Sequence, residues 1–291
     1  MIRKIGIIME MIKFEHTVFA LPFAFMGALL GAVVVEKRLP EWSEIGWILL
    51  AMVGARSAAM GLNRIIDRAI DKMNPRTANR AIPAGLLKVA EVMLFTVVSF
   101  AVLIFAASFL DPICMKLMPI AVFLLVLYSY TKRFTWLCHV FLGLTIGLAP
   151  LGAWVAVTGT LDASAWLLYV AVVFWLAGFD IIYACQDFEF DRKHGVYSIP
   201  ARFGLRGALW ISRVFHMITA ACFLMLFWLT PLSWGYLLGT IIAAAILFYE
   251  HWLVQPNDTS RVQTAFFTMN GTLSIVVFVC TLFDLVVLRV W

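Results

Sequence analysis

Residues 63–85 read N-R-I-I-D-R-A-I-D-K-M-N-P-R-T-A-N-R-A-I-P-A-G and connect a long apolar segment to a polar loop. Asn63, Asp67 and Asp71 follow one another at intervals of four residues. An α-helix of about 3.6 residues per turn therefore places their oxygen-bearing side chains on one face. Two stacked carboxylates repel each other unless a cation neutralises them, and Mg²⁺ prefers hard oxygen ligands shared with substrate phosphates. The spacing predicts a Mg²⁺ site on this helix.

Pro75 limits that helix, because proline removes a backbone donor and clashes with the preceding turn. Arg76 and Arg80 follow directly. Guanidinium groups just beyond a carboxylate pair indicate that the other partner of the metal is an anion with several oxygens, such as a diphosphate.

A second aspartate pair repeats the pattern within D-I-I-Y-A-C-Q-D-F-E-F-D-R-K-H-G. Asp187 and Asp191 are again four residues apart, and Arg192 and Lys193 follow. A single pair of this kind is most often a solvated helix end. Two pairs, each at the end of a long apolar segment and each followed by basic residues, favour a shared functional site.

The composition identifies the chain as an integral membrane protein. It has 291 residues, of which 63% are hydrophobic and 13% charged, and its mean hydropathy is +0.95. A helical span needs about 20 mostly apolar residues, and the sequence predicts nine spans in one domain, 1–291. Because the segments lack two-residue alternation, we expect an all-α protein rather than a barrel. The predicted spans are 16–36, 44–66, 90–110, 116–131, 136–158, 163–186, 207–229, 232–253 and 264–287.

The amino-terminal segment, residues 1–14, has isoleucines at helical spacing. It can form an amphipathic helix that lies on the membrane surface, or one that packs against the bundle. Glu10 and Lys13 interrupt it before a long apolar core forms, so no cleavable signal peptide is predicted. The five cysteines lack paired spacing, which predicts neither a disulfide framework nor a zinc site.

The net charge of +5 does not indicate a nucleic-acid partner, because the basic residues sort by membrane side. By the positive-inside rule, the amino terminus and the even-numbered loops are cytoplasmic, at the cell inner membrane, and the carboxyl terminus is outside. Fifteen of the 22 basic residues lie on the predicted cytoplasmic side: Arg3, Lys4, Lys13, Arg68, Lys72, Arg76, Arg80, Lys88, Lys132, Arg133, Arg192, Lys193, Arg202, Arg206 and Arg261.

Two charged residues lie deeper in the predicted spans. Arg56 precedes Asn63 by two helical turns on the same face, so it lies roughly 10 Å deeper. Asp180 precedes Asp187 by the same interval. A buried arginine must face the bundle interior, where it binds either a substrate anion or a structural carboxylate. Lys132, four residues after Tyr128, is either an ordinary membrane anchor or a phosphate ligand.

The chain resembles the UbiA superfamily of membrane prenyltransferases, and most closely its 4-hydroxybenzoate polyprenyltransferase-like branch. The resemblance spans essentially the whole chain. It is carried by N-R-I-I-D-R-A-I-D with R-T-A-N-R-A-I-P-A-G, by Y-S-Y-T-K-R, and by D-I-I-Y-A-C-Q-D-F-E-F-D-R-K. It implies a bundle of nine helices around a central cavity, in which both aspartate motifs bind Mg²⁺ and a polyprenyl diphosphate.

The resemblance also implies residue roles. A polyprenyl group would pass to an aromatic hydroxy acid, either 4-hydroxybenzoate or a dihydroxynaphthoate, in ubiquinone or menaquinone biosynthesis. The proton acceptor is Asp180, Asp67 or Asp187. The expected metal ligands are Asn63, Asp67, Asp71, Asp187 and Asp191, and the four carboxylates among them are expected, with Asp180, to be catalytic. The expected substrate-binding residues are Arg56, Asn63, Arg76, Arg80, Tyr128, Lys132, Tyr183 and Lys193.

Two departures from the family pattern concern the acceptor. Asn63 is followed by Arg64, where relatives often have Asn-Asp, and the first span begins K-F-E-H-T, where relatives often have an Arg and a Lys-Pro pair. These features resemble a subgroup associated with menaquinone synthesis through the futalosine route, whose acceptor would be a dihydroxynaphthoate.

The competing class is an ion-coupled transporter, because intramembrane aspartates and arginines also suit ion translocation. Against it, the carboxylates gather at one membrane face rather than at the midplane. The arginine-containing loops also suit a phosphate better than a cation path.

The charge asymmetry makes a topological prediction. Cysteines introduced at Thr77 or Val196 should react with an impermeant thiol reagent from the cytoplasm, and cysteines at Leu39 or Thr160 only from outside. Labelling of 77 and 196 from opposite sides would rule out a site shared by the two motifs.

Overall fold

The computed structural model describes residues 2–12 and 17–288. Lys13–His16, which belong to the K-F-E-H-T segment, and Arg289 lie outside the described residues. The helices are α1 Ile2–Met11, α2 Thr17–Gly31 with η2 Ala32–Glu36, α3 Trp42–Met73, α4 Val89–Ala107, α5 Pro112–Thr131, α6 Cys138–Thr158, α7 Ala163–Ala184, η3 Cys185–Asp187, α8 Phe188–His194, α9 Ile199–Leu229, α10 Trp234–Leu253, η4 Thr264–Met269, α11 Asn270–Phe283 and η5 Asp284–Leu288.

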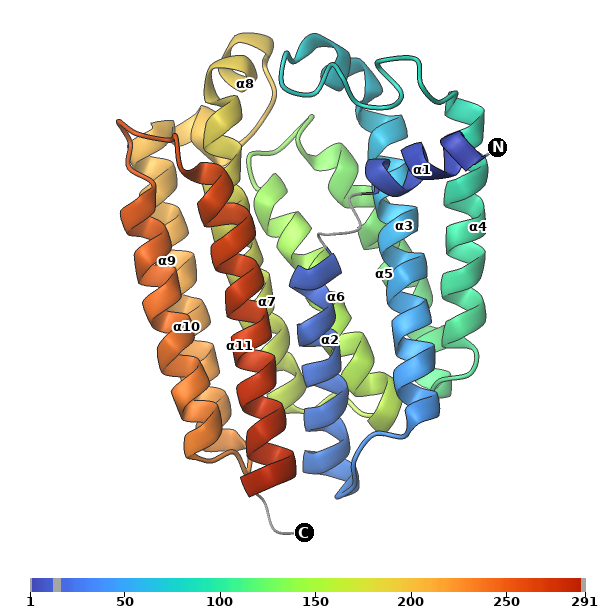
Figure 1. Ribbon diagram of the computed structural model, residues 1–291, viewed down its shortest axis with the longest axis vertical. Helices are drawn as coiled ribbons and strands as arrows, with labels where there is room; N and C mark the ends of the chain where they lie inside the picture. The colour runs from blue at the N-terminus through green and yellow to red at the C-terminus, as the bar shows by residue number, and fades with distance from the viewer. Residues whose placement is uncertain (1, 13–16, 289–291) are drawn as a thin grey trace.

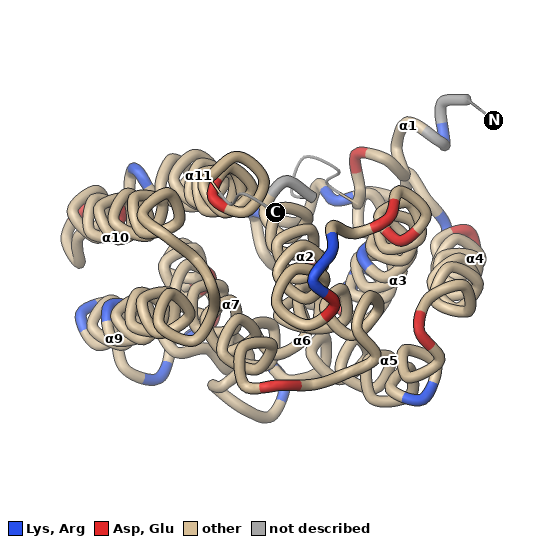
Figure 2. Tube along the Cα trace, turned by 90° about the horizontal axis from the view of Figure 1, so that it is seen from below, with Lys and Arg blue, Asp and Glu red and all other residues tan. Residues whose placement is uncertain are grey.

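Within the described ranges, nine helical segments are long and apolar enough to cross a bilayer, which confirms the predicted all-α membrane fold. Seen end-on, the helices form a ring in which α11 closes against α2, and α2 also packs against α6 (Figure 2). The loop after α3, helix α8 and helix α1 lie at one end of the bundle, and η5 lies at the other (Figure 1). Both aspartate motifs therefore reach the same end.

The structure of the loop after α3 changes which of its residues is suited to cysteine labelling. Thr77 is only 3% exposed, because its hydroxyl donates to the carbonyl of Asp71 at 3.0 Å. Asn79 is exposed in the same loop and is the better position for an introduced cysteine.

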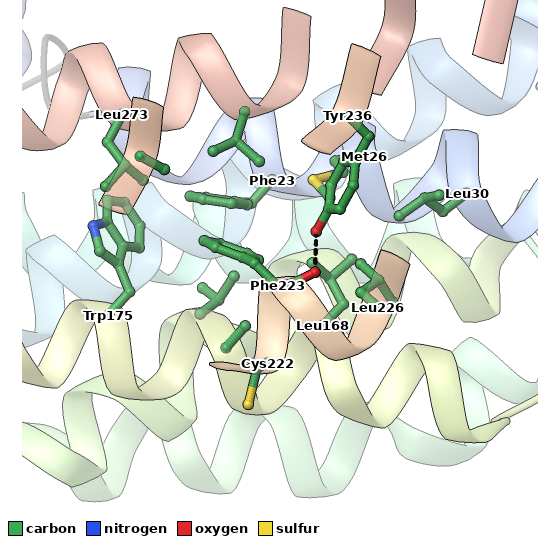
Figure 3. Close-up of a cluster of buried hydrophobic side chains, with 14 of the residues drawn as sticks. Phe23, Met26, Leu30, Leu168, Trp175, Cys222, Phe223, Leu226, Tyr236 and Leu273 are labelled. Atoms are coloured by element: carbon green, nitrogen blue, oxygen red, sulfur yellow. Dashed lines mark hydrogen bonds between the residues drawn. The ribbon is translucent and has the colours of Figure 1, made fainter. Parts of the chain in front are cut away.

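The main hydrophobic core joins helices that are distant in the sequence. Phe23 of α2 packs against Trp175 of α7, with ring centroids 4.8 Å apart. It also stacks on Phe223 of α9 at 6.0 Å. The buried Tyr236 hydroxyl donates to the Phe223 carbonyl at 2.8 Å (Figure 3). Burial of these large rings fixes the helices around which the polar end is built.

Glycines let α6 approach its neighbours closely, as their number in the fifth span predicts. A Cβ atom at Gly143 would lie 2.4 Å from the carbonyl oxygen of Val173 in α7, and one at Gly27 would lie 2.2 Å from that of Pro150. Larger residues at these positions would force the backbones apart.

Several predicted boundaries differ from the structure; the second span, for example, continues to Met73 instead of ending at 66. Helix α9 begins at Ile199, where the Ser198 hydroxyl caps it and Pro200 occupies its first turn, and the predicted seventh span, 207–229, is the part of it that follows Gly204. Gly204 interrupts α9 with φ 71°, a left-handed conformation that glycine adopts without strain. In the sixth span, helix α7 ends at Ala184, and the chain continues through η3 into α8. Asp187 and Asp191 therefore do not share one regular helix.

Helix α1 packs against the bundle, which is one of the two arrangements that the sequence allows. Met11 and Ile12 are buried against Ile65 and Leu87. Lys4 forms an exposed ion pair with Glu91 at the start of α4. These contacts tie the amino-terminal helix to α3, to the loop after it and to α4.

A buried polar network joins α7, α10 and α11 at Asn270. The indole nitrogen of Trp175 donates to the Asn270 side-chain oxygen at 2.8 Å. The Asn270 side-chain nitrogen in turn donates to Glu250 at 3.0 Å. Glu250 and Asn270 are both 0% exposed. Each therefore depends on the other, since a buried polar group without a partner is costly.

Replacement of Asn270 by alanine should lower the free energy of unfolding by about 2–4 kcal/mol, because two buried groups each lose a partner. Thermal unfolding of the purified protein in detergent measures the effect. Asn257→Ala, at an exposed loop position, is the matched control and should leave the midpoint unchanged. Equal midpoints for the two variants would contradict a stabilising role for the network.

Candidate active site

A polar cavity of about 290 Å³ lies at the end of the bundle where the two motifs meet. Its walls come from α3 and the following loop, the end of α5, the start of α6, and the α7–α8 region with the segment after it. The lining residues include Met60, Asn63, Arg64, Asp67, Asp71, Asn74, Arg76, Thr77, Arg80, Tyr128, Ser129, Lys132, His139, Asp180, Tyr183, Asp187, Asp191 and Ser198.

The first motif occupies the last turns of α3, as predicted. Asn63, Asp67 and Asp71 all line the cavity, and Asn63 donates its side-chain N–H to Asp67 at 2.7 Å. Asp67 is 1% exposed and Asp71 is 3% exposed. Asn74, immediately before Pro75, ends the helix in an extended conformation, so the chain turns back over the cavity.

Basic residues from two segments neutralise these carboxylates. Lys132 lies 2.6 Å from Asp67, and Arg133 lies 3.0 Å from the other oxygen of Asp67. Arg80, in the loop after α3, donates to both oxygens of Asp71 at 2.7 and 2.8 Å. Buried carboxylates require such partners, because desolvation of an unpaired charge costs several kcal/mol.

The second motif is held partly by the loop of the first. Arg76 binds Asp187 in a two-pronged ion pair, and Asn74 donates to the same carboxylate at 2.8 Å. Arg76 also donates to the Tyr183 hydroxyl at 3.2 Å. Burial lowers the pKa of Arg76, but the hydrogen bond and charge of Asp187 outweigh it, so the pKa is raised overall. The arginine stays charged, and the pair links the two motifs.

Asp191 has a different environment. It is 8% exposed, and the Ser198 hydroxyl donates to it at 2.8 Å. Gly195 ends α8 with φ 68°, which turns the chain so that Ser198 reaches back to the carboxylate.

Asp180 pairs with a histidine from α6. His139 is 4% exposed, and its Nδ1 lies 2.7 Å from Asp180. The backbone N–H of Ile199 donates to His139 Nε2 at 3.4 Å. Since Nε2 accepts, the ring proton belongs on Nδ1, where it is donated to Asp180. The histidine therefore orients the Asp180 carboxylate at the cavity wall.

A larger apolar cavity of about 520 Å³ adjoins the polar one and shares Met60, Tyr128 and Leu142 with it. Its other walls are mostly alanine, leucine, isoleucine and methionine side chains of α3, α5 and α6. Arg56 also lines it. The predicted stripe on α3 thus runs from the apolar cavity at Arg56, through Met60, into the polar cavity.

The structure brings most of the predicted site residues together. Arg56 lines the apolar cavity instead of the polar one, and Lys193 is exposed on α8 and is not among the residues that line either cavity. The predicted residues that line the polar cavity are Asn63, Asp67, Asp71, Arg76, Arg80, Tyr128, Lys132, Asp180, Tyr183, Asp187 and Asp191.

Further residues were missed from the sequence, among them Arg64, Asn74, Arg133, His139 and Ser198. His139 had a signal, because a histidine within an apolar span must find a polar partner, and Asp180 was the unpaired acid at a similar depth. Arg133 lies next to the predicted Lys132. Ser198 lies in a loop and gave no signal.

The donor set fits a hard cation, since four carboxylates and an amide oxygen line one cavity together with basic groups suited to phosphate. Among the described residues, no three His, Cys, Asp or Glu side chains are grouped so that they could hold a metal ion. The motif carboxylates are bound instead to Lys132, Arg133, Arg80, Arg76, Asn74 and Ser198.

The chain is similar in sequence to known proteins. The chain is 29% identical to 4-hydroxybenzoate octaprenyltransferase of Vibrio campbellii, over 82% of this chain and 84% of the relative. It is 31% identical to the protein of the same name from Aliivibrio fischeri, over 80% of each chain.

Solved structures give the same result for the fold. A UbiA homologue from Aeropyrum pernix superposes with a TM-score of 0.84 at 31% identity, covering 93% of this chain and 98% of that one. A homologue from Archaeoglobus fulgidus bound to DMAPP and Mg²⁺ superposes with a TM-score of 0.74 at 18% identity, covering 96% and 99%. Residues 21–272 match the sequence profile of the UbiA prenyltransferases, and the chain therefore belongs to the UbiA prenyltransferase family.

Proposed function

We propose that this protein transfers a polyprenyl group from a polyprenyl diphosphate to a hydroxylated aromatic carboxylate, in a Mg²⁺-dependent reaction. The observation that carries the proposal is the pairing of the two cavities. A carboxylate- and arginine-lined cavity adjoins a larger apolar one across Met60, Tyr128 and Leu142. A polyprenyl diphosphate has the same division into a charged head and an apolar tail.

The diphosphate would occupy the polar cavity. Asn63, Asp67, Asp71, Asp187 and Asp191 would hold Mg²⁺ there. When bound, the metal supplies positive charge that stabilises the departing diphosphate. A structure of the same fold from Archaeoglobus fulgidus was solved with DMAPP and Mg²⁺ bound, which agrees with a diphosphate and a cation as the ligands.

The basic groups would assist in the same place. Arg76, Arg80 and Lys132 are held at the cavity wall by motif carboxylates, so they are oriented before the substrate enters. Preorganised cations stabilise the charge that develops on the leaving group without reorganising during the reaction. The allylic C–O bond then breaks, and its electron pair leaves with the diphosphate.

The prenyl tail would extend into the apolar cavity, whose walls exclude water from the allylic cation. The acceptor ring attacks this cation, and a C–C bond forms. Arg56, which lines the same cavity, would bind the acceptor carboxylate with its planar fork.

The ring must then lose a proton to a base. Asp67, Asp187 and Asp180 are the sequence-derived alternatives. Asp67 and Asp187 are each bound by two groups from neighbouring segments, whereas Asp180 is oriented by His139 at the cavity wall. This arrangement favours Asp180 as the proton acceptor.

The acceptor is 4-hydroxybenzoate or a dihydroxynaphthoate. The names of the bacterial relatives favour the first, and the N-R-I-I-D motif favours the second. A panel of both acids, assayed with Mg²⁺ and polyprenyl diphosphates of several lengths, tests the proposal directly. We place the polar cavity at the cytoplasmic face of the inner membrane, as the basic-residue distribution indicates.

Asp191→Asn should reduce turnover roughly a thousandfold, because loss of a metal ligand removes several kcal/mol of transition-state stabilisation. Folding should be preserved, since the Ser198 hydroxyl can donate to the new amide oxygen. Steady-state turnover and thermal unfolding are measured together. Asp258→Asn, in an exposed loop, is the control, and wild-type turnover in Asp191→Asn with an unchanged Mg²⁺ requirement would contradict the metal assignment.

Arg56→Lys should raise the KM for the acceptor more than the KM for the donor, because lysine keeps the charge but loses the two-pronged geometry. A neutral acceptor analogue without the carboxylate serves as the control and should be insensitive to the change. If the donor KM rises and the acceptor KM does not, Arg56 belongs to the diphosphate site or to the scaffold.

A further inference from the structure

Arg64 differs from the other basic residues of the polar cavity. Four basic side chains line this cavity: Arg64, Arg76, Arg80 and Lys132. The last three are ion-paired with Asp187, Asp71 and Asp67 respectively. In the part of the chain that the structure describes, the Arg64 side chain has no hydrogen bond and no salt bridge.

The lack of a hydrogen bond or salt bridge matters because the Arg64 side chain is buried. Arg64 is 7% exposed and belongs to a helix that crosses the membrane. A guanidinium group in such a place is costly unless an anion compensates it. A buried polar group that lacks a protein partner therefore needs another explanation, such as a ligand or a catalytic role.

The carboxylates of Asp67 and Asp71 on α3 accept no hydrogen bond from Arg64, because other groups bind them. Asp67, one turn later, is bound to Lys132 and Arg133. Asp71, two turns later, is bound to Arg80 through both oxygens. An anion that enters the cavity can thus bind Arg64 without breaking an existing ion pair.

The location of Arg64 selects the kind of anion. It lines the polar cavity with both aspartate motifs, and it is not among the residues that line the apolar cavity. Arg56, two turns deeper on α3, lines the apolar cavity instead. The guanidinium fork also matches two phosphate oxygens at once.

We propose that Arg64 binds the diphosphate of the prenyl donor and contributes to donor affinity, an inference that rests on the proposed prenyl transfer. A guanidinium here supplies positive charge to the diphosphate.

The test measures binding without turnover. Purified protein is titrated by calorimetry with inorganic diphosphate at fixed Mg²⁺, and separately with 4-hydroxybenzoate. Arg64→Gln should weaken diphosphate binding by about ten- to a hundredfold, the effect of losing charge-assisted hydrogen bonds. It should leave 4-hydroxybenzoate binding unchanged, and Arg64→Lys should retain part of the diphosphate affinity.

Thermal unfolding separates this role from a structural one. Without ligand, Arg64→Gln should unfold at or above the wild-type temperature, because the variant no longer buries an uncompensated charge. The rise in midpoint that diphosphate causes should shrink. Arg68→Gln is the matched control: Arg68 lies one turn later on α3, is exposed and is not a lining residue, so it should behave as wild type in both measurements.

Three results would overturn the inference. Weakened 4-hydroxybenzoate binding with intact diphosphate binding would assign Arg64 to the acceptor carboxylate. A large loss of ligand-free stability with intact diphosphate binding would make Arg64 structural. If the wild-type protein does not bind diphosphate at all, the proposed function fails and the inference fails with it.

Discussion

The polar end of this protein depends on the compensation of buried carboxylates. Asp67, Asp71 and Asp191 are each less than a tenth exposed, at the end of an otherwise apolar bundle. Since an isolated charge is unstable in such surroundings, every one of them is bound by a group from another part of the chain. The partners are Lys132 at the end of α5, Arg80 in the loop after α3, and Ser198 before α9. The two ion pairs and the hydrogen bond thus hold the walls of the cavity together and place charged groups in them.

This requirement explains the irregular backbone at that end. Pro75 stops α3, so the following loop can fold back and bring Arg76 to Asp187 on the opposite wall. Gly195 ends α8 in a left-handed conformation and returns the chain to Asp191 through Ser198. A straight continuation of either helix would carry these groups away from the cavity. Backbone breaks are therefore found where side chains from distant segments must converge.

The sequence predicted the membrane fold well, because the apolar character of the nine segments is a local property. It also predicted the first motif, since Asn63, Asp67 and Asp71 share a helix and their geometry follows from the helical period. Contacts between segments were less accessible. His139 and Asp180 are 41 residues apart, and Ser198 meets Asp191 only because η3 and α8 interrupt the sixth span. Arg64 shows a different limit. The sequence showed an arginine at this position, but it could not show that the nearby carboxylates Asp67 and Asp71 are bound to other basic residues.

The two adjoining cavities also bear on the choice between an enzyme and a transporter. An ion path needs polar groups toward the middle of the membrane, whereas the deeper cavity here is walled mostly by alanine, leucine, isoleucine and methionine. The motif carboxylates and their basic partners remain at one end, where they neutralise each other. A molecule with an anionic head and an apolar tail matches this division, and its head-to-tail bond then lies near Met60 and Tyr128, which belong to both cavities. In the proposed reaction the reactive carbon would lie at this boundary, with stabilising charge on one side and exclusion of water on the other, which is the environment that ionisation of an allylic diphosphate requires.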